Sequence, residues 1–194
     1  EFGKNELVKT NIKIPIKILN HAKNNNIFKK INKNQCRLRL FNETIQNKFL
    51  ILNSNVNINR KRLDICLKAF SQFCVDKDNV LLILKCLKSK TKNSFDIDYL
   101  INKYSIDKNK VICIEKILDL NELGLLYNCV DIGINTTSGE GWGLIPCEMA
   151  LCGIPQIVPN NTSYPEIFGS NFDYAKTNSI NYISGRKKCT REVK

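Results

Sequence analysis

Residues 130–158, VDIGINTTSGEGWGLIPCEMALCGIPQIV, contain the pattern that decides the fold. The apolar run at 130–134 predicts a buried strand, and the run at 145–152 predicts a short helix. A third apolar run at 154–158 predicts a second buried strand. Because the two strands are joined through a helix, we expect them to lie parallel in one sheet.

The turn between the first strand and the helix is rich in glycine. Gly139, Gly141 and Gly143 permit positive φ angles and a close approach of the backbone to a ligand. Pro146 suits the first helical turn, and Gly153 suits the end of the helix. The turn therefore leads into a helix whose free N–H groups and dipole favour an anion.

The same alternation of elements extends upstream. Uninterrupted apolar runs predict buried strands at 49–52, 80–84 and 111–114, and helices are expected at 62–73, at 95–104 with Ser94 as N-cap, and at 121–129. Parallel strands that are apolar throughout are covered on both faces. The fold class predicted is α/β, a doubly wound Rossmann-like parallel sheet with an N-terminal linker extension.

The domain organisation follows from shifts in composition. Residues 1–48 are rich in Asn and Lys, with an apolar stretch at 12–19 and weak helical character at 33–41, and are interpreted as a linker. Residues 49–176 form the Rossmann-like domain, and 177–194 form a polar, basic tail. The chain begins with Glu1 rather than Met, which suggests a piece of a longer polypeptide.

The composition narrows the class of protein. No apolar run approaches the roughly 20 residues of a membrane span. Nine scattered cysteines, without a CxxC pair and with a single histidine, predict no metal site and a reducing compartment, hence the cytoplasm. His21 is interpreted as a linker residue rather than a catalytic one.

The net charge of +12 raises the question of an anionic partner. The lysines are dispersed, and only Arg60, Lys61 and Arg62 form a tight cluster, without the aromatic residues that stack bases. Nucleic acid is therefore not expected, whereas phosphates or the cytoplasmic face of a membrane are. Cations at the start of a predicted helix are electrostatically disfavoured, which favours a bound anion there.

Two carboxylates flank the start of the predicted helix at 145–152. Glu140 and Glu148 would repel a phosphate but accept hydrogen bonds from the paired hydroxyls of a ribose or a sugar. A nucleotide-sugar has hydroxyls at both ends and a diphosphate between them. The alternative is that Glu140 is a solvated turn residue and that Glu148 only complements the helix dipole.

The stretch TSGEGWGLIPCEMALCG, residues 137–153, resembles the signature of the retaining glycosyltransferases of family 4, which have the GT-B fold. Two glutamates separated by seven residues carry this resemblance. The segments FLILNSNVNINRKRLDICLKAFSQF and IPQIVPNNTSYPEIFG resemble neighbouring parts of the family, so that the match covers about residues 12–169. It spans only the second, nucleotide-sugar-binding domain of the two-domain fold.

The resemblance implies roles for particular residues. Glu140 would contact the hydroxyls of the donor sugar, Glu148 the ribose hydroxyls, and Lys61 the diphosphate. Val56 occupies the position of the family's partner arginine, so that Arg60 or Arg62 would have to supply the missing charge. Further donor contacts are implied for Gly141, Trp142, Gly143 and Leu144 at the turn and for Glu115, Lys116 and Ile117 near the base.

The expected activity is retaining transfer of a sugar, of the hexosyltransferase type, to an unknown acceptor, with no metal or other cofactor. The acceptor would bind to an N-terminal domain that this chain lacks, so turnover by the chain alone is not expected. Two alternatives remain: an inactive or regulatory remnant of such a domain, and a basic nucleic-acid-binding module.

Overall fold

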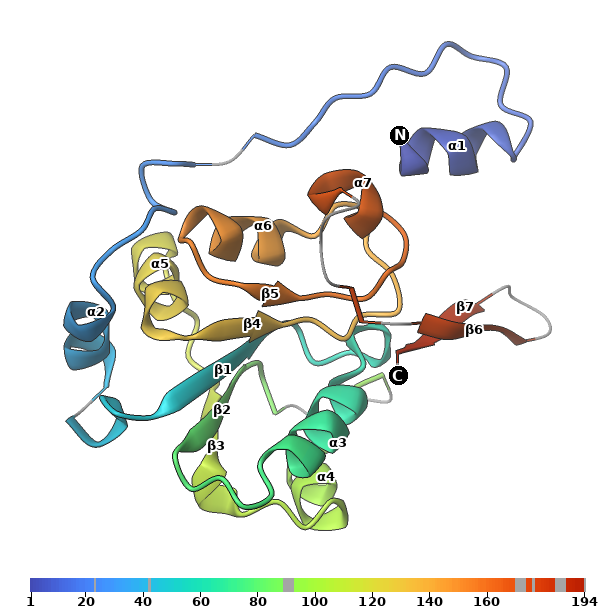
Figure 1. The fold of residues 1–194 in the computed structure, drawn as a ribbon. Helices are drawn as coiled ribbons and strands as arrows, with labels where there is room; N and C mark the ends of the chain where they lie inside the picture. Colours follow the sequence, from blue (N-terminus) through green and yellow to red (C-terminus); the bar gives the residue numbers. More distant parts are fainter. Residues whose placement is uncertain are drawn as a thin grey trace.

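The computed structural model describes residues 1–22, 24–41, 43–88, 93–169, 174–175, 177–183 and 188–193, the last two ranges as backbone only. Within them a five-stranded, all-parallel sheet has the strand order β3-β2-β1-β4-β5 (Figure 1). The strands are β1 Phe49–Ser54, β2 Val80–Lys85, β3 Val111–Ile114, β4 Ile132–Ile134 and β5 Gln156–Ile157. The predicted α/β fold with a doubly wound parallel sheet is confirmed.

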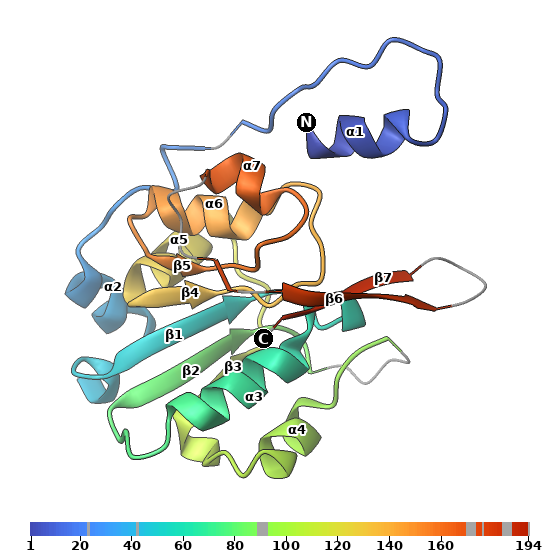
Figure 2. The ribbon, with the colours of Figure 1, turned by 45° about the vertical axis from the view of Figure 1, so that its right-hand side comes forward.

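Helices cover both faces of the sheet, as Figure 2 shows from the side. On one face lie α3 Leu63–Phe73 and α4 Ile97–Lys103, and on the other lie α5 Leu120–Cys129 and α6 Leu144–Leu151. Short 3-10 helices are η1 Glu43–Ile45, η2 Asn59–Lys61 and η3 Lys108–Lys110. The remaining elements are α1 Phe2–Val8, α2 Lys33–Leu40, α7 Tyr164–Phe168 and an antiparallel pair, β6 Thr177–Ile183 with β7 Lys188–Val193, within the expected tail.

Alternation along the central strands builds two cores. Leu50, Leu52 and Ile83 pack on the side of α5 and α6, whereas Leu82 and Leu84 pack on the side of α3 and α4. All five side chains are fully buried. Because both faces of these strands are buried, apolar residues run through them without interruption.

The last two strands are shorter than their apolar runs predict. Val130 is the C-cap of α5, and β4 begins only at Ile132. At β5 the flanking residue Pro155 has no amide to donate and contributes only its carbonyl, which accepts from the Gly133 N–H at 2.9 Å.

The predicted N-cap of α4 is wrong. The helix begins two residues later, where the Asp96 carboxylate accepts a hydrogen bond from the Tyr99 N–H at 3.0 Å. The reason is a tertiary contact: the Asn57 side chain binds both peptide groups of Phe95, at 2.9 Å each. This contact fixes Phe95 outside the helix.

The segment predicted as a linker contains a helix at the expected place, and this helix packs against α5 (Figure 1). Arg37 of α2, only 3% exposed, donates from Nε to the Cys129 carbonyl at 2.8 Å and pairs with Asp131 at 2.8 Å. Helix α2 thereby contributes to the core of the sheet domain. The domain boundary at residue 48 stays a prediction.

Candidate functional site

The site lies where the order of the strands reverses. Chain connections run from β1 outward to β2 and β3, and then return to β4 on the other side of β1. The loops after β1 and β4 therefore diverge at the carboxyl edge of the sheet, where open α/β sheets bind ligands. Two hydrogen bonds connect these loops. The Ser138 N–H donates to the Arg60 carbonyl at 2.9 Å, and the Thr136 hydroxyl donates to the Lys61 carbonyl at 3.1 Å.

The glycine turn delivers the chain into α6 with one left-handed residue. Gly143 is the N-cap, with φ 89°, and a Cβ there would lie 2.4 Å from Cε1 of Tyr164. Gly139 and Gly141 are not in the left-handed region. Beyond α6, Gly153 has φ 76°, as its position at the end of the helix predicted.

Glu140 and the basic cluster face each other across the two loops. Lys61 Nζ pairs with Glu140 Oε1, and Arg60 pairs with Oε2 at 3.1 Å. The side chains of Lys61 and Glu140 are only 10% and 12% exposed, while Arg60 is half exposed. Two members of the cluster thus meet the Glu140 carboxylate at the sheet edge, whereas Arg62 pairs with Asp64.

A hollow of about 350 Å³ opens beside this pair. The Glu140 hollow, as we name it, is lined by His21, Lys61, Asn135, Glu140, Trp142, Gly143, Leu144, Ile145 and Pro146. The His21 ring meets the Trp142 ring edge to face, with 5.4 Å between centroids. The sequence did not predict this position for His21, because no local pattern links the two residues.

A second hollow, of about 360 Å³, lies on the other side of the α6 start. The Glu148 hollow is lined by Ser54, Asn55, Val56, Lys85, Cys86, Leu87, Glu115, Ile117, Leu118, Leu123, Tyr127, Leu144, Ile145 and Glu148. The Tyr127 hydroxyl donates to Glu148 Oε2 at 3.2 Å. Burial, and then the Glu148 carboxylate, raise the pKa of Tyr127 far above its usual range, so that the phenol remains a donor.

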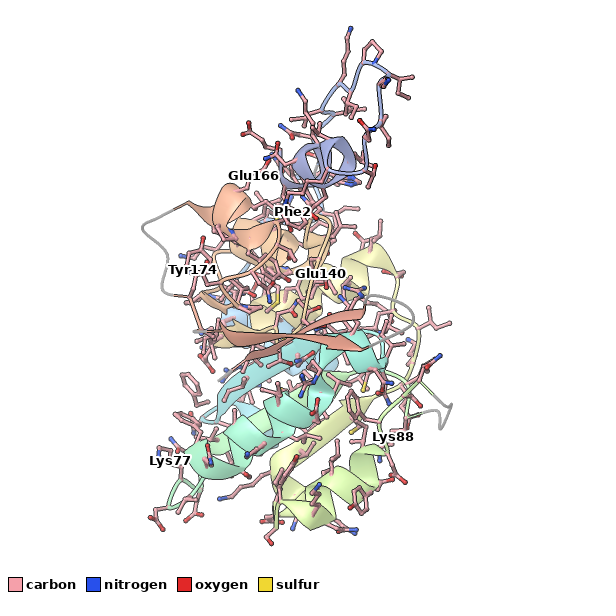
Figure 3. The ribbon with its side chains drawn as sticks, turned by 90° about the vertical axis from the view of Figure 1, so that its right-hand side faces the viewer. Phe2, Lys77, Lys88, Glu140, Glu166 and Tyr174 are labelled. Carbon is pink, nitrogen blue, oxygen red and sulfur yellow. The ribbon has the colours of Figure 1, made fainter. Side chains whose placement is uncertain are left out.

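The two hollows share Leu144 and Ile145, the first residues of α6. The two predicted carboxylates therefore line adjacent hollows on either side of one helix start. Figure 3 shows Glu140 just below the junction of α1 and α7, where the Phe2 N–H donates to Glu166 at 2.7 Å. In the same view, Lys77 lies at the lower left and Lys88 at the lower right.

Not every predicted site residue joins the hollows. Lys116 pairs with Glu122 at 2.6 Å on the surface, and Arg62 forms a bidentate pair with Asp64 at 3.0 Å. Neither residue lines either hollow. Val56, 66% exposed, lines the Glu148 hollow without bringing a charge.

The chemistry of the two hollows suits a ligand with hydroxyls and phosphates. The Glu140 hollow offers the Glu140 carboxylate with Lys61 beside it, and the Glu148 hollow offers the carboxylates of Glu148 and Glu115. Arg60 and Gly141 line neither of these but a third hollow of about 360 Å³, which Glu140 also lines. A larger hollow of about 460 Å³ beside α3 is almost wholly apolar and lacks such groups. Among the described residues there is no cluster of three potential metal ligands, and none of their helices is long and apolar enough to cross a membrane.

Comparison with known proteins gives the architecture a name. No protein-family model and no curated protein matches the sequence. Among solved structures, the chain is similar to the C-terminal domain of the glycosyl transferase group 1 family protein LpcC from Francisella tularensis, with 20% identity and a TM-score of 0.64 over 80% of each chain.

Two longer proteins are similar over one part of their length. HepE from Anabaena, solved with UDP and glucose, matches with 19% identity and a TM-score of 0.67 over 82% of this chain and 43% of its own. Sucrose-phosphate synthase from Thermosynechococcus elongatus matches with 19% identity and a TM-score of 0.68 over 87% and 42%. This chain therefore has the fold of the Rossmann-like half of a GT-B glycosyltransferase and spans less than half the length of these two proteins.

Proposed function

We propose that this chain is the donor-binding half of a glycosyltransferase, which takes a nucleoside-diphosphate-sugar and transfers its sugar with retention of configuration. The observation that carries the proposal is the placement of Glu140 and Glu148 in two hollows that meet at the start of α6. The solved structures of HepE with UDP and UDP-glucose support the ligand class by analogy of fold.

The Glu148 hollow would take the nucleoside. Glu148 accepts hydrogen bonds from two ribose hydroxyls, and the Tyr127 hydroxyl orients the carboxylate by its own hydrogen bond. Apolar side chains, among them Ile117, provide contacts for a base. The Glu115 carboxylate accepts from the Lys88 N–H at 3.1 Å, which holds the loop after β3 in place.

The Glu140 hollow would take the sugar, with the diphosphate crossing the start of α6. Lys61 and Arg60 neutralise the negative charge that develops on the leaving diphosphate, and the helix N-terminus adds to this effect. Once these cations turn to the phosphates, the Glu140 carboxylate is released to accept from sugar hydroxyls. No metal or other cofactor is needed in this proposal.

The acceptor would bind to a second domain placed across the Glu140 hollow. That domain, the sugar, the base and the acceptor are not defined by these residues. The cytoplasm is the proposed compartment because the eight cysteines described are free thiols.

Donor binding is tested by thermal unfolding with UDP-glucose and GDP-mannose. We expect at least one donor to raise the Tm and Glu148→Gln to remove most of that shift, because an amide cannot accept both ribose hydroxyls as a carboxylate does. Glu6→Gln in α1 is the matched control and should keep the shift. An unchanged shift in Glu148→Gln would remove the assignment of this carboxylate.

One observation favours an inactive or regulatory remnant as a second candidate, namely the uncharged Val56 on the rim of the Glu148 hollow. For such a remnant, no nucleotide-sugar donor would raise the Tm. Tight, salt-sensitive binding to oligonucleotides would instead point to a nucleic-acid module.

A further inference from the structure

Lys85 ends a row of apolar side chains on one face of the sheet. Leu81 and Ile83 of β2 pack in the core on the side of α5 and α6. Lys85 follows on the same face, because successive side chains of a strand point to opposite faces. Its register partner is Ser54, the last residue of β1. Lys85 therefore lies at the carboxyl edge of the sheet, on the side that α5 and α6 cover.

Lys85 lines the Glu148 hollow and is partly exposed. Its ammonium group forms no ion pair or hydrogen bond with the residues that the structure describes. The two acids that line the same hollow have other contacts. Glu148 accepts from the Tyr127 hydroxyl at 3.2 Å, and Glu115 accepts from the Lys88 N–H at 3.1 Å. The hollow thus offers a charged donor whose hydrogens are available to a ligand.

The strand order places Lys85 away from the start of α6. Strand β2 lies between β1 and β3, whereas α6 follows β4 on the other side of β1 (Figure 1). Glu115 follows Ile114, the register partner of Lys85 on β3, so that the two charged side chains line neighbouring parts of the hollow. In the proposed function the diphosphate crosses the start of α6, and the base meets the loop after β3. The position of Lys85 therefore suits a contact with the base rather than with the phosphates.

A lysine beside a carboxylate can distinguish the bases by their exocyclic groups. Lysine is a donor only, and it pairs with a carbonyl oxygen such as O4 of uracil or O6 of guanine. Cytosine and adenine have an amino group at that position, so that two donors would face each other. Uracil and guanine also have a ring N–H next to the carbonyl, from which a carboxylate such as that of Glu115 can accept.

We propose that Lys85 selects the base of the bound nucleotide. Its ammonium donates to the carbonyl oxygen of a uracil or guanine ring, and Glu115 accepts from the adjacent ring N–H. Nucleotides of cytosine and adenine are thereby disfavoured. The inference rests on the proposed function for the class of ligand and adds the class of base.

Titration calorimetry with UDP, CDP, GDP and ADP tests this selection. We expect UDP to bind about tenfold more tightly than CDP, or GDP than ADP, because a charged hydrogen bond replaces an unpaired donor. Lys85→Met keeps the stem of the side chain and should reduce this ratio to about one, through weaker binding of the carbonyl base. A wild-type chain that binds the amino bases as tightly as the carbonyl bases would overturn the proposal.

The charge-reversed variant tests for an inversion that a merely structural role would not produce. Lys85→Glu presents an acceptor at the same place and should bind CDP more tightly than UDP, or ADP more tightly than GDP. Lys88→Met and Lys88→Glu are the matched controls and should keep the wild-type ratio, since Lys88 pairs with Asp98 and lines neither hollow.

Two results with Lys85→Met would also overturn the proposal. An equal loss of affinity for all four nucleotides would assign the ammonium to a phosphate. Unchanged affinities would show that Lys85 is a solvated surface charge.

The Tm shift with UDP-glucose and GDP-mannose, measured on the same chains, separates this inference from the proposed function. Base-selective binding of nucleotides without a shift from either nucleotide-sugar would sink only the proposed function. A shift together with unselective binding of the bases would sink only the role of Lys85. A chain that binds none of these ligands would sink both.

Discussion

At the residue scale, the geometry around Gly143 shows how closely the turn is packed. Its φ of 89°, and the 2.4 Å that would separate an added Cβ from the Tyr164 ring, leave room for glycine alone. Gly141, two residues earlier, has no atom within 4 Å of the corresponding position. The glycine turn thus has one position that requires glycine and another that does not.

Gly143→Ala should therefore destabilise the chain by about 3 kcal/mol, from backbone strain together with the clash with Tyr164. Urea unfolding followed by circular dichroism measures this change. Gly141→Ala is the control and should cost less than about 1 kcal/mol. Equal losses in the two variants would contradict the packing described here.

Val56 offers a second test at the residue scale, because it lines the Glu148 hollow and is exposed. Val56→Arg should tighten binding of UDP about tenfold, and the gain should shrink as salt screens the added charge. Titration calorimetry at two salt concentrations measures both effects. Val75→Arg, at an exposed position beyond α3, is the matched control and should bind as the wild type does.

At the element scale, Asp131 joins three segments at the start of β4. Its carboxylate pairs with Arg37 at 2.8 Å and Lys33 at 2.6 Å, and it accepts from the Leu50 N–H at 2.7 Å. Burial alone would raise the pKa of Asp131, but the Leu50 amide and the two cations outweigh it and lower that pKa. One carboxylate thus fixes α2 against the sheet.

Asp131→Asn should cost about 3 kcal/mol, because it leaves the buried Arg37 guanidinium without its charge partner. Asp98→Asn, which removes a surface pair, should cost less than about 1 kcal/mol. Since the folded pKa is depressed, the contribution of Asp131 is present above its unfolded value of about 3.9 and is lost as the pH falls through the folded value. The stability difference from the wild type, measured by urea unfolding, should therefore shrink below about pH 4.

At the scale of the whole molecule, two buried thiols report on the core that α3 and α4 form with the sheet. Burial raises the pKa of Cys66 and of Cys86 to about 12 each, which suppresses the reactive thiolate at neutral pH. We expect these thiols to react with Ellman's reagent only as the domain unfolds, with the same urea midpoint as circular dichroism. Rapid labelling of Cys66 in native buffer would show that the α3 face opens locally.

Much of the fold could be predicted from the sequence because its signals are local. Apolar runs placed all five strands, and Pro146 and Gly153 placed α6. The prediction erred where a distant contact decided a boundary: Asn57 binds Phe95 and moves the start of α4 past Ser94. No window of sequence around Ser94 contains Asn57.

For the candidate site, too, the local features could be predicted from the sequence and the contacts between distant residues could not. The glycine turn and the two carboxylates could be named from spacing, and the structure places them on the edge predicted for them. The sequence could not predict three contacts between these parts of the site. They are the ion pair of Glu140 with Lys61, the ring contact of His21 with Trp142, and the hydrogen bond from Tyr127 to Glu148. Conversely, two residues that the sequence predicted as ligand contacts lie outside the hollows. Arg62 pairs with Asp64, and Lys116 pairs with Glu122.

The sequence by itself determined the order of strands and helices and the residues that follow each strand, because hydrophobic periodicity and the backbone limits of glycine and proline act over a few residues. Only the tertiary structure decided which of those residues meet. Lys61 and Glu140 are 79 positions apart, and they come together because β1 and β4 are neighbours in the sheet. That neighbourhood depends on how the helices cover the two faces of the whole sheet.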